Sequence, residues 1–305
     1  MVIRVCSLLL LFVLNLLLLA PVSTRAAEPA PLYALCAAYP PEIAAFQSEF
    51  GVSERTDWTR TVIKGIEFWR GEAGGKQLII FRTGISLVNA AYQLQLALDH
   101  FPITHILFAG VAGGTDPALQ IGDVVIPERW AYHGEAAYLN EDPAKPGSYI
   151  IPDYLKPKYE NFGMIFPDDT AVIREGQSEF ADVPAFPADP GLLAAARRAL
   201  PKIPAMRKAG RTVSVNAGGT GVAGQVFLDH AAYREWLFRV WQARCVDMES
   251  TALAHVAYAN TKPILIIRGL SDLAGGQHGK NPIDANEATV SVIAVKVLRH
   301  VLDEL

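Results

Sequence analysis

The sequence predicts a single α/β domain in which a mixed, twisted central β-sheet is flanked by helices. Residues 264–267 read ILII, an apolar run without alternation that is typical of a strand covered on both faces. Immediately before it, Leu253, Val256 and Ala257 recur at helical spacing, and Asn260 is a plausible helix stop. A second apolar run, 103–108, leads into the glycine cluster AGVAGG, where the backbone has room to approach a ligand.

The amino-terminal half supplies the first strands and helices. We expect a strand over residues 32–38, then a helix in AAYPPEIAAFQSEF, with Pro41 and Glu42 in its first turn. Residues 62–70 and 77–83 alternate roughly as a hairpin does, with Gly74-Gly75 at the turn. The segment TGISLVNAAYQLQLALDHF then predicts a glycine-containing loop and a long helix.

The carboxyl-terminal half is less regular. IGDVVIPERWAYH predicts one more strand, and residues 139–210 form a Pro-rich excursion with one clear helix, 190–199, capped by Asp189. Residues 211–215 resume the sheet. GGTGVAGQVFLDHAAYREWLF predicts a glycine loop, then Phe227, then a helix, and the last helix covers 285–302.

The amino terminus has the pattern of a secretory signal peptide. Arg4 precedes a hydrophobic run over 5–20, and a small-residue site ends at Ala26. We therefore expect residues 1–26 to be removed and residues 27–305 to form the mature domain. The protein would be exported and soluble, periplasmic in a Gram-negative source, without stable membrane association after cleavage. The alternative is an uncleaved anchor, although the run is short for a spanning helix.

Composition excludes several classes of function. The chain of 305 residues has a net charge of −4 and no basic stripe, so it lacks the electrostatic footprint of a nucleic-acid-binding protein. Cys36 and Cys245 lie in apolar strand contexts, which predicts two buried thiols rather than a disulfide. The seven histidines show no metal-ligand spacing, so we expect no metal site.

Two acids follow neighbouring predicted strands. Glu249 stands at a strand-to-helix junction, and Asp272 stands where the 264–267 strand stops. In open α/β sheets the ligand crevice lies at the carboxyl ends of the strands, so both carboxylates would face it. The structural alternative is that Asp272 caps the next segment and Glu249 stabilises a helix start.

The motifs VDMESTALAHVA and IIRGLSDLAGG resemble the signature of the nucleoside phosphorylase/nucleosidase superfamily, and in detail the 5'-methylthioadenosine/S-adenosylhomocysteine nucleosidases. AAYPPEIAAF, AGVAGGTDPALQIGDVVIPE and GQVFLD are similar to further segments of these enzymes. The resemblance extends over most of the mature chain. It implies a nucleoside phosphorylase-like fold, a small-molecule purine nucleoside as partner, no cofactor and a homodimer.

The resemblance also implies roles for individual residues. Asp272 would be the general acid that protonates the leaving purine, and Glu42 would orient the attacking water. Glu249 would accept hydrogen bonds from the ribose hydroxyls. The remaining implied contacts are Met248 packed on the sugar, Phe227 stacked on the base, the Leu228 backbone at the base edge, Gly113 in the glycine loop, and Arg268 and Ser271 holding Asp272.

Breaking an N-glycosidic bond leaves an oxocarbenium-like sugar, so the chemistry needs a protonated acid at the base and a carboxylate near the sugar. Asp272 must therefore have a raised pKa, whereas Glu249 must stay ionised or strongly hydrogen-bonded. The resemblance implies hydrolysis of a purine nucleoside, such as 5'-methylthioadenosine or S-adenosylhomocysteine, with release of the free base.

Two alternatives remain open. The first is a phosphorylase, whose phosphate-binding arginines have no counterpart here, because Phe108 stands at one of the two positions and AAYPPEI at the other. Arg82, at another strand end, is a further arginine to consider. The second is an exported nucleoside-binding or storage-type protein, suggested by Val111, which stands where the nucleosidases have a serine that helps place the water.

Overall fold

The computed structural model describes residues 30–305, which form both helices and strands. The predicted signal peptide lies outside these residues. The amino-terminal elements are β1 (Leu32–Ala37), α2 (Pro40–Glu49), β2 (Thr59–Ile63), β3 (Ile66–Ala73), β4 (Lys76–Arg82), α3 (Leu87–His100) and β5 (His105–Gly114). The first strand, the first two helices and the Gly74-Gly75 turn are therefore confirmed.

The remaining elements bring the chain back to the same sheet several times. They are β6 (Val124–Ile126), β7 (Arg129–Tyr132), β8 (Ala136–Tyr138), β9 (Ile165–Pro167), β10 (Thr170–Val172), β11 (Ala181–Val183), β12 (Phe186–Pro187), α4 (Pro190–Ala199), the 3-10 helix η2 (Leu200–Lys202), β13 (Arg207–Lys208), β14 (Arg211–Thr212), β15 (Val215–Ala217), β16 (Thr220–Ala223), α5 (Ala231–Trp241), β17 (Ala243–Asp247), α6 (Ser250–Ala259), β18 (Ile264–Asp272) and α7 (Ile283–Leu302).

One mixed sheet organises these elements, which confirms the predicted fold class. Its main path runs β12-β7-β16-β17-β5-β1-β4-β3-β2, and β18, β6 and β15 complete its twelve strands. β5 pairs in parallel with β1 and β18 but antiparallel with β17. β5 and β18 are buried along nearly their whole length, as expected of strands covered on both faces.

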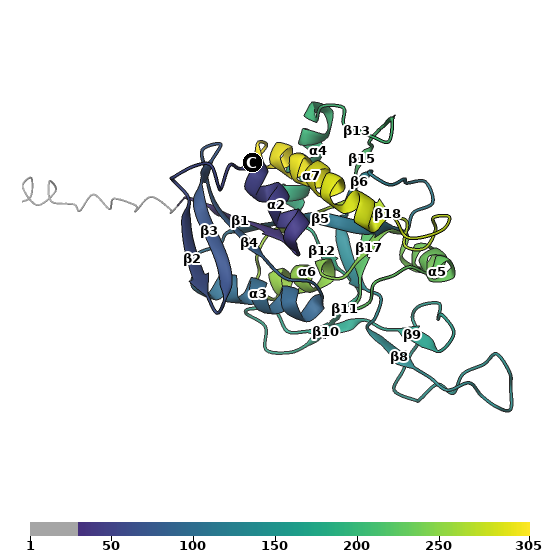
Figure 1. The fold of residues 1–305 in the computed structure, drawn as a ribbon. Helices are drawn as coiled ribbons and strands as arrows, with labels where there is room; N and C mark the ends of the chain where they lie inside the picture. The colour runs from purple at the N-terminus through teal and green to yellow at the C-terminus, as the bar shows by residue number, and fades with distance from the viewer. Residues whose placement is uncertain (1–29) are drawn as a thin grey trace, which may run out of the picture. The chain divides into compact units, whose positions relative to one another are not determined.

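Helices cover the sheet in two layers (Figure 1). Residues of α2, α4 and α7 share one apolar core with one side of the strands. Residues of α3 and α6 share a second core with the opposite side, and α5 packs against β16 and β17 in a smaller cluster. Asp189 caps α4 as predicted, because its carboxylate accepts from the Leu192 amide at 2.9 Å.

The Pro-rich excursion is only partly separate from the sheet. β8 pairs with β9 and β10 pairs with β11 in two separate two-stranded sheets, and β8 and β9 extend away from the main sheet in Figure 1. β12, however, pairs with β7 at the edge of the main sheet. The prediction that residues 139–210 leave the core is therefore wrong for Val172, Phe186 and α4, whose buried side chains belong to the two apolar cores.

Five other strand predictions need correction. The expected strand 62–70 is two strands, because Lys64 and Gly65 adopt positive φ angles of 48° and 82° and reverse the chain. IGDVVIPERWAYH likewise forms two strands, β6 and β7. The sheet resumes at 215–217 in β15, whereas 211–212 belongs to a small hairpin.

Glycine was the misleading signal in the other two cases. β5 continues through AGVAGG, and the predicted glycine loop at 220–223 is the strand β16. A Cβ at Gly221 would lie 2.6 Å from the Trp130 ring, so this glycine serves close packing inside the sheet rather than a turn.

Cys36 and Cys245 are both buried and free, which confirms the predicted thiols.

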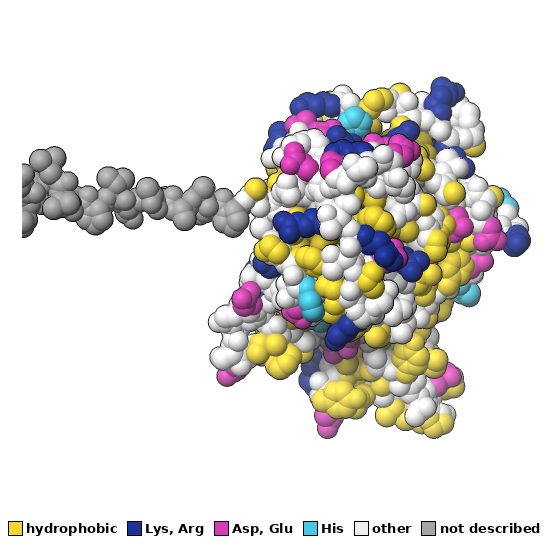
Figure 2. Space-filling model, turned by 60° about the vertical axis from the view of Figure 1, so that its left-hand side comes forward, with side chains coloured by type: hydrophobic (Ala, Val, Ile, Leu, Met, Phe, Trp, Pro, Cys, Tyr) yellow, Lys and Arg dark blue, Asp and Glu magenta, His cyan; other side chains and the backbone are white. Residues whose placement is uncertain are grey.

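Within residues 30–305, no helix is long and apolar enough to cross a membrane. On the face drawn in Figure 2, Lys and Arg side chains are scattered among acidic and apolar ones rather than gathered in a stripe.

Candidate functional site

A pocket opens where the carboxyl ends of β1, β5, β17 and β18 meet. Eight of the nine predicted site residues line it: Glu42, Gly113, Phe227, Leu228, Met248, Glu249, Ser271 and Asp272. These residues come from segments that are far apart in the sequence. The sheet brings them together at its carboxyl edge, which is the arrangement expected for an open α/β sheet.

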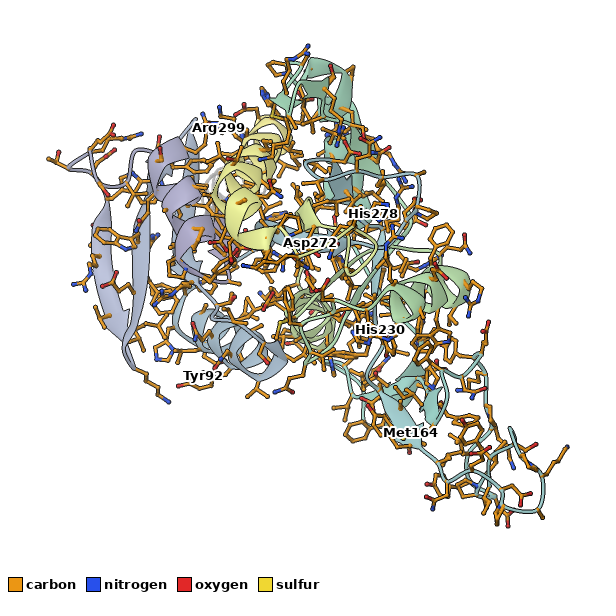
Figure 3. All side chains as sticks on the ribbon, turned by 45° about the vertical axis from the view of Figure 1, so that its right-hand side comes forward. Tyr92, Met164, His230, Asp272, His278 and Arg299 are labelled. Carbon is orange, nitrogen blue, oxygen red and sulfur yellow. The ribbon has the colours of Figure 1, made fainter. Side chains whose placement is uncertain are left out.

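Asp272 is buried at the end of β18, and Figure 3 labels it in the interior of the domain. Its carboxyl accepts from the Ser271 hydroxyl at 2.9 Å, the Ala274 amide at 2.8 Å and the Asn281 side-chain amide at 3.3 Å. Burial raises the pKa of Asp272, although these three donors act in the opposite direction. The Ala274 contact is the local cap that the structural alternative anticipated.

Arg268 is not where the sequence prediction put it. Its side chain is fully buried beneath the pocket and does not contact Asp272; only Ser271 supports that acid as expected. The Arg268 guanidinium instead contacts Asp247 at 2.6 Å, Glu249 at 3.2 Å and Glu42 at 3.4 Å. The bulge in β18 between Leu270 and Asp272 changes which way the last side chains point, so spacing from Arg268 was a poor guide.

Glu42 is fixed by two backbone amides. One carboxylate oxygen accepts from the Ala38 amide at 2.6 Å and the other from the Val111 amide at 2.8 Å. Burial raises the pKa of Glu42 despite the opposing charge of Arg268. The hydroxyl missing at Val111 is therefore not needed to hold this carboxylate, because the contact uses the backbone.

Glu249 faces the pocket and does not cap a helix. Its side chain accepts from the Ser86 amide at 2.8 Å, whereas the start of α6 is capped by Asp247, which accepts from the Glu249 and Ser250 amides at 3.1 and 3.0 Å. The structural alternative for Glu249 is thus wrong.

Glu249 was expected to be ionised or strongly hydrogen-bonded, and its carboxyl accepts hydrogen bonds from the Ser86 amide and from Arg268. Burial and the neighbouring carboxylate of Asp247 raise the pKa of Glu249 to about 8, against the opposing effect of Arg268. Three acids share one guanidinium, so a proton on Glu249 would relieve the repulsion among them. The carboxyl can then donate to a ligand hydroxyl as well as accept from one.

Three residues of the site escaped the sequence prediction. Asp247 and Gly110 lie in motifs that the sequence analysis recognised. Their roles were missed because both residues act through Arg268, whose position in the fold the sequence does not show. A Cβ at Gly110 would lie 2.0 Å from Glu42 Oε1 and 2.2 Å from Arg268 Nη1, so only glycine fits there. Asn281 lies nine residues beyond Asp272, and no spacing rule connects the two.

The structure also shows where Phe108 and Arg82 lie, the two residues that bear on a phosphate site. Phe108 is buried under Arg268, whose guanidinium carbon lies 4.0 Å from the ring centroid. Arg82 lies outside the pocket. Trp130 and His133 are buried and do not line the pocket. Residues 30–305 contain no cluster of His, Cys, Asp and Glu suited to a metal ion.

Comparison with known proteins gives consistent matches. The chain matches the phosphorylase superfamily over residues 33–305. It is 31% identical over 253 residues to a 5'-methylthioadenosine/S-adenosylhomocysteine nucleosidase of Mycobacterium tuberculosis, with 82% of this chain and 90% of the relative covered. A protein of the same name from Psychromonas ingrahamii is 29% identical over 240 residues, covering 76% of this chain and 86% of the relative.

Solved structures share the fold. The futalosine hydrolase of Helicobacter pylori superposes with a TM-score of 0.68 at 21% identity, covering 90% of this chain and 99% of the other. The 5'-methylthioadenosine/S-adenosylhomocysteine nucleosidase of Colwellia psychrerythraea, in complex with adenine, gives 0.66 at 22% identity, covering 90% and 96%.

Gly110→Ala tests whether the close approach of Glu42 and Arg268 is essential. The added methyl group must displace one of these buried side chains, so we expect a loss of about 1–3 kcal/mol in the free energy of unfolding. Urea denaturation of the variant and the parent measures this difference.

Gly134→Ala is the matched control, because a Cβ there meets no atom within 4 Å. Its free energy of unfolding should equal that of the parent within about 0.5 kcal/mol. A Gly110→Ala variant as stable as the control would contradict the packing described for this site.

Proposed function

The chain belongs to the phosphorylase superfamily, and from that premise we propose that it hydrolyses the N-glycosidic bond of a purine nucleoside and releases the free base. The observation that carries the proposal is the arrangement of Asp272 and Glu249 in one pocket. The pKa of each carboxyl is raised by burial, but only Glu249 belongs to the Arg268 cluster.

Asp272 is the general acid in this proposal. Its raised pKa favours a proton on the carboxyl, which is then available to the leaving purine nitrogen. As the base departs, positive charge develops on the sugar. The acidic cluster around Arg268 faces that position and stabilises the charge.

Water is the nucleophile, and Glu42 orients it. Two backbone amides hold the Glu42 carboxylate at the glycine-rich strand β5, so its position is set before substrate binds. The raised pKa of Glu42 also makes it a stronger base than an ordinary glutamate when it is ionised.

The rest of the pocket suits a nucleoside. Phe227 is half exposed at the pocket mouth, where a base can stack on it, and the backbone of Leu228 follows at the base edge. Met248 lies on the sugar side beside Glu249. Because the relatives named above are 5'-methylthioadenosine/S-adenosylhomocysteine nucleosidases, an adenosine thioether is the substrate we propose.

Two alternatives differ from this proposal in their products. A phosphorylase requires a paired phosphate, and the pocket lining contains no arginine among the residues that the structure describes. A nucleoside-binding or storage-type protein would bind without turnover, as the Val111 substitution suggests. Incubation with methylthioadenosine, with and without phosphate, separates the three: free base without phosphate, sugar phosphate with it, or neither.

Export is proposed from the amino-terminal sequence alone. Removal of residues 1–26 should leave a mature chain that begins near Ala27. Intact-mass measurement of the protein from its native host checks this. An intact Met1 in a membrane fraction would show an anchor instead.

A homodimer is proposed from the apolar side chains near the pocket mouth. Ile85, Val88 and Tyr92 are about half exposed or more around the start of α3, and Phe227 is similarly exposed. Light scattering should therefore give twice the chain mass. A fully active monomer at working concentration would refute the dimer.

Asp272→Asn tests the general acid. The amide keeps size and hydrogen bonding but has no proton to give, so turnover should fall by about two to four orders of magnitude. Substrate binding should change much less, because the interaction is used mainly in the transition state. In the parent, turnover should fall as pH rises through the raised pKa of Asp272.

Two matched variants locate the other roles. Glu42→Gln should lower turnover with little loss of binding, whereas Glu249→Gln should weaken both, because the ribose contact exists before reaction. Hydrolysis by Asp272→Asn within about threefold of the parent rate would exclude this residue as the acid.

A further inference from the structure

Two loops meet beside the general acid. Residues 224–230, the base loop, join β16 to α5 and carry Phe227, which lines the pocket. Residues 273–282, the acid loop, join β18 to α7 and begin directly after Asp272. The catalytic roles described above leave most of both loops without a function.

The two loops are in direct backbone contact. The His230 amide donates to the Ala274 carbonyl at 3.1 Å. Gly275, with a φ of 92°, passes so close that a Cβ there would lie 2.3 Å from the His230 backbone nitrogen. Figure 3 labels one residue of each loop, His230 and His278. A side chain at position 275 would push the loops apart, so the acid loop lies tightly against the base loop.

Asp229 of the base loop binds side chains of the acid loop. Its Oδ1 atom accepts from Gln277 Nε2 at 2.6 Å and from Asn281 Nδ2 at 3.1 Å. The Gln277 Oε1 atom accepts in turn from the amides of Leu273 at 3.0 Å and Gly275 at 3.3 Å. One carboxylate oxygen therefore ties together the beginning and the end of the acid loop.

Asn281 extends these contacts to Asp272. The Nδ2 atom that donates to Asp229 also donates to Asp272 Oδ1 at 3.3 Å. An amide nitrogen carries two hydrogens, so one can serve each carboxyl. The Asn281 Oδ1 atom accepts from the Ile283 amide at 3.0 Å, which fixes the same orientation of the side chain. The direction of this donor toward the acid is therefore set by Asp229 on one side and by the start of α7 on the other.

Asp229 also acts on Asp272 through its charge. Burial is the largest cause of the raised pKa of Asp272, and the Asp229 carboxylate adds a smaller effect in the same direction. Asp229 is exposed, so water and salt screen this effect. Besides the acids around Arg268, the other charged or titratable side chains near the two loops have different partners or lie at the surface. They are His230, Arg234, His278, Lys280, Asp284 and Glu287.

We propose that Asp229 is a positioning residue for the general acid. It holds the acid loop against the base loop, so that Asn281 contacts Asp272 and water is kept away from the acid. The segment that binds the base and the group that protonates it are thereby fixed in one geometry before substrate binds. The proposal rests on the assignment of Asp272 as the general acid, made above.

Asp229→Asn and Asp229→Ala test this role through the titration of Asp272, followed by carboxyl ¹³C NMR. The asparagine keeps an oxygen acceptor but removes the charge, so the pKa of Asp272 should fall by about 0.5. The alanine also releases the acid loop and admits water, so the pKa should fall by about 1 or more. Because the acid must be protonated, the alkaline limb of kcat against pH should move to lower pH by the same amounts.

Glu235→Gln is the matched control, because this exposed acid lies outside both loops, on α5. It should leave the titration of Asp272 unchanged. An Asp272 signal that titrates in Asp229→Ala as it does in the parent would overturn the proposal. Equal shifts in the two Asp229 variants would also overturn it, since the charge alone would then act. If Asp272→Asn keeps the parent rate, the general acid assignment fails, whereas the NMR titration still shows whether Asp229 positions Asp272.

Discussion

One buried guanidinium organises the site. Arg268 is fully enclosed and contacts the carboxyls of Glu42, Asp247 and Glu249, which come from α2, the end of β17 and the start of α6. A buried charge is tolerated only when it is well paired, so these elements must meet Arg268 in one geometry. Removing one partner from such a cluster typically costs about 3–5 kcal/mol. Gly110 and Phe108 follow from the same constraint, since one leaves space for the ion pairs and the other gives the guanidinium an aromatic face.

The cluster also explains how two environments for carboxyl groups arise in one pocket. Burial and, after it, repulsion from the neighbouring carboxylate of Asp247 raise the pKa of Glu249 to about 8, although Arg268 acts in the opposite direction. Asp272 stands apart from Arg268 and is surrounded by uncharged donors, so burial dominates its pKa. An arginine at position 108, as a phosphorylase would need, would stand against Arg268. The cluster and a phosphate-binding arginine therefore compete for the same place.

Much of the fold could be predicted because its strongest signals are local. The ILII run predicts a buried strand, and the spacing of Leu253, Val256 and Ala257 predicts a helix. Both patterns can be read within a short stretch of sequence. Glycine misled the prediction in β5 and β16, because Gly110 and Gly221 make room for side chains that are distant in sequence. Glu249 and Asp272 were found from their strand ends, whereas the role of Glu42 came from the family resemblance. The true partners of Arg268, and the contact of Asn281 with Asp272, depend on tertiary packing and a strand bulge.

The proposed chemistry depends on a proton that stays on Asp272 in a buried site. A carboxyl ¹³C NMR titration of the protein labelled at aspartate, with the signal assigned by its loss in Asp272→Asn, measures this directly. We expect the Asp272 signal to titrate clearly above the ordinary aspartate value of about 3.9. A titration at or below that value would mean that the three hydrogen-bond donors outweigh burial, and Asp272 would then be ionised and unable to act as the acid.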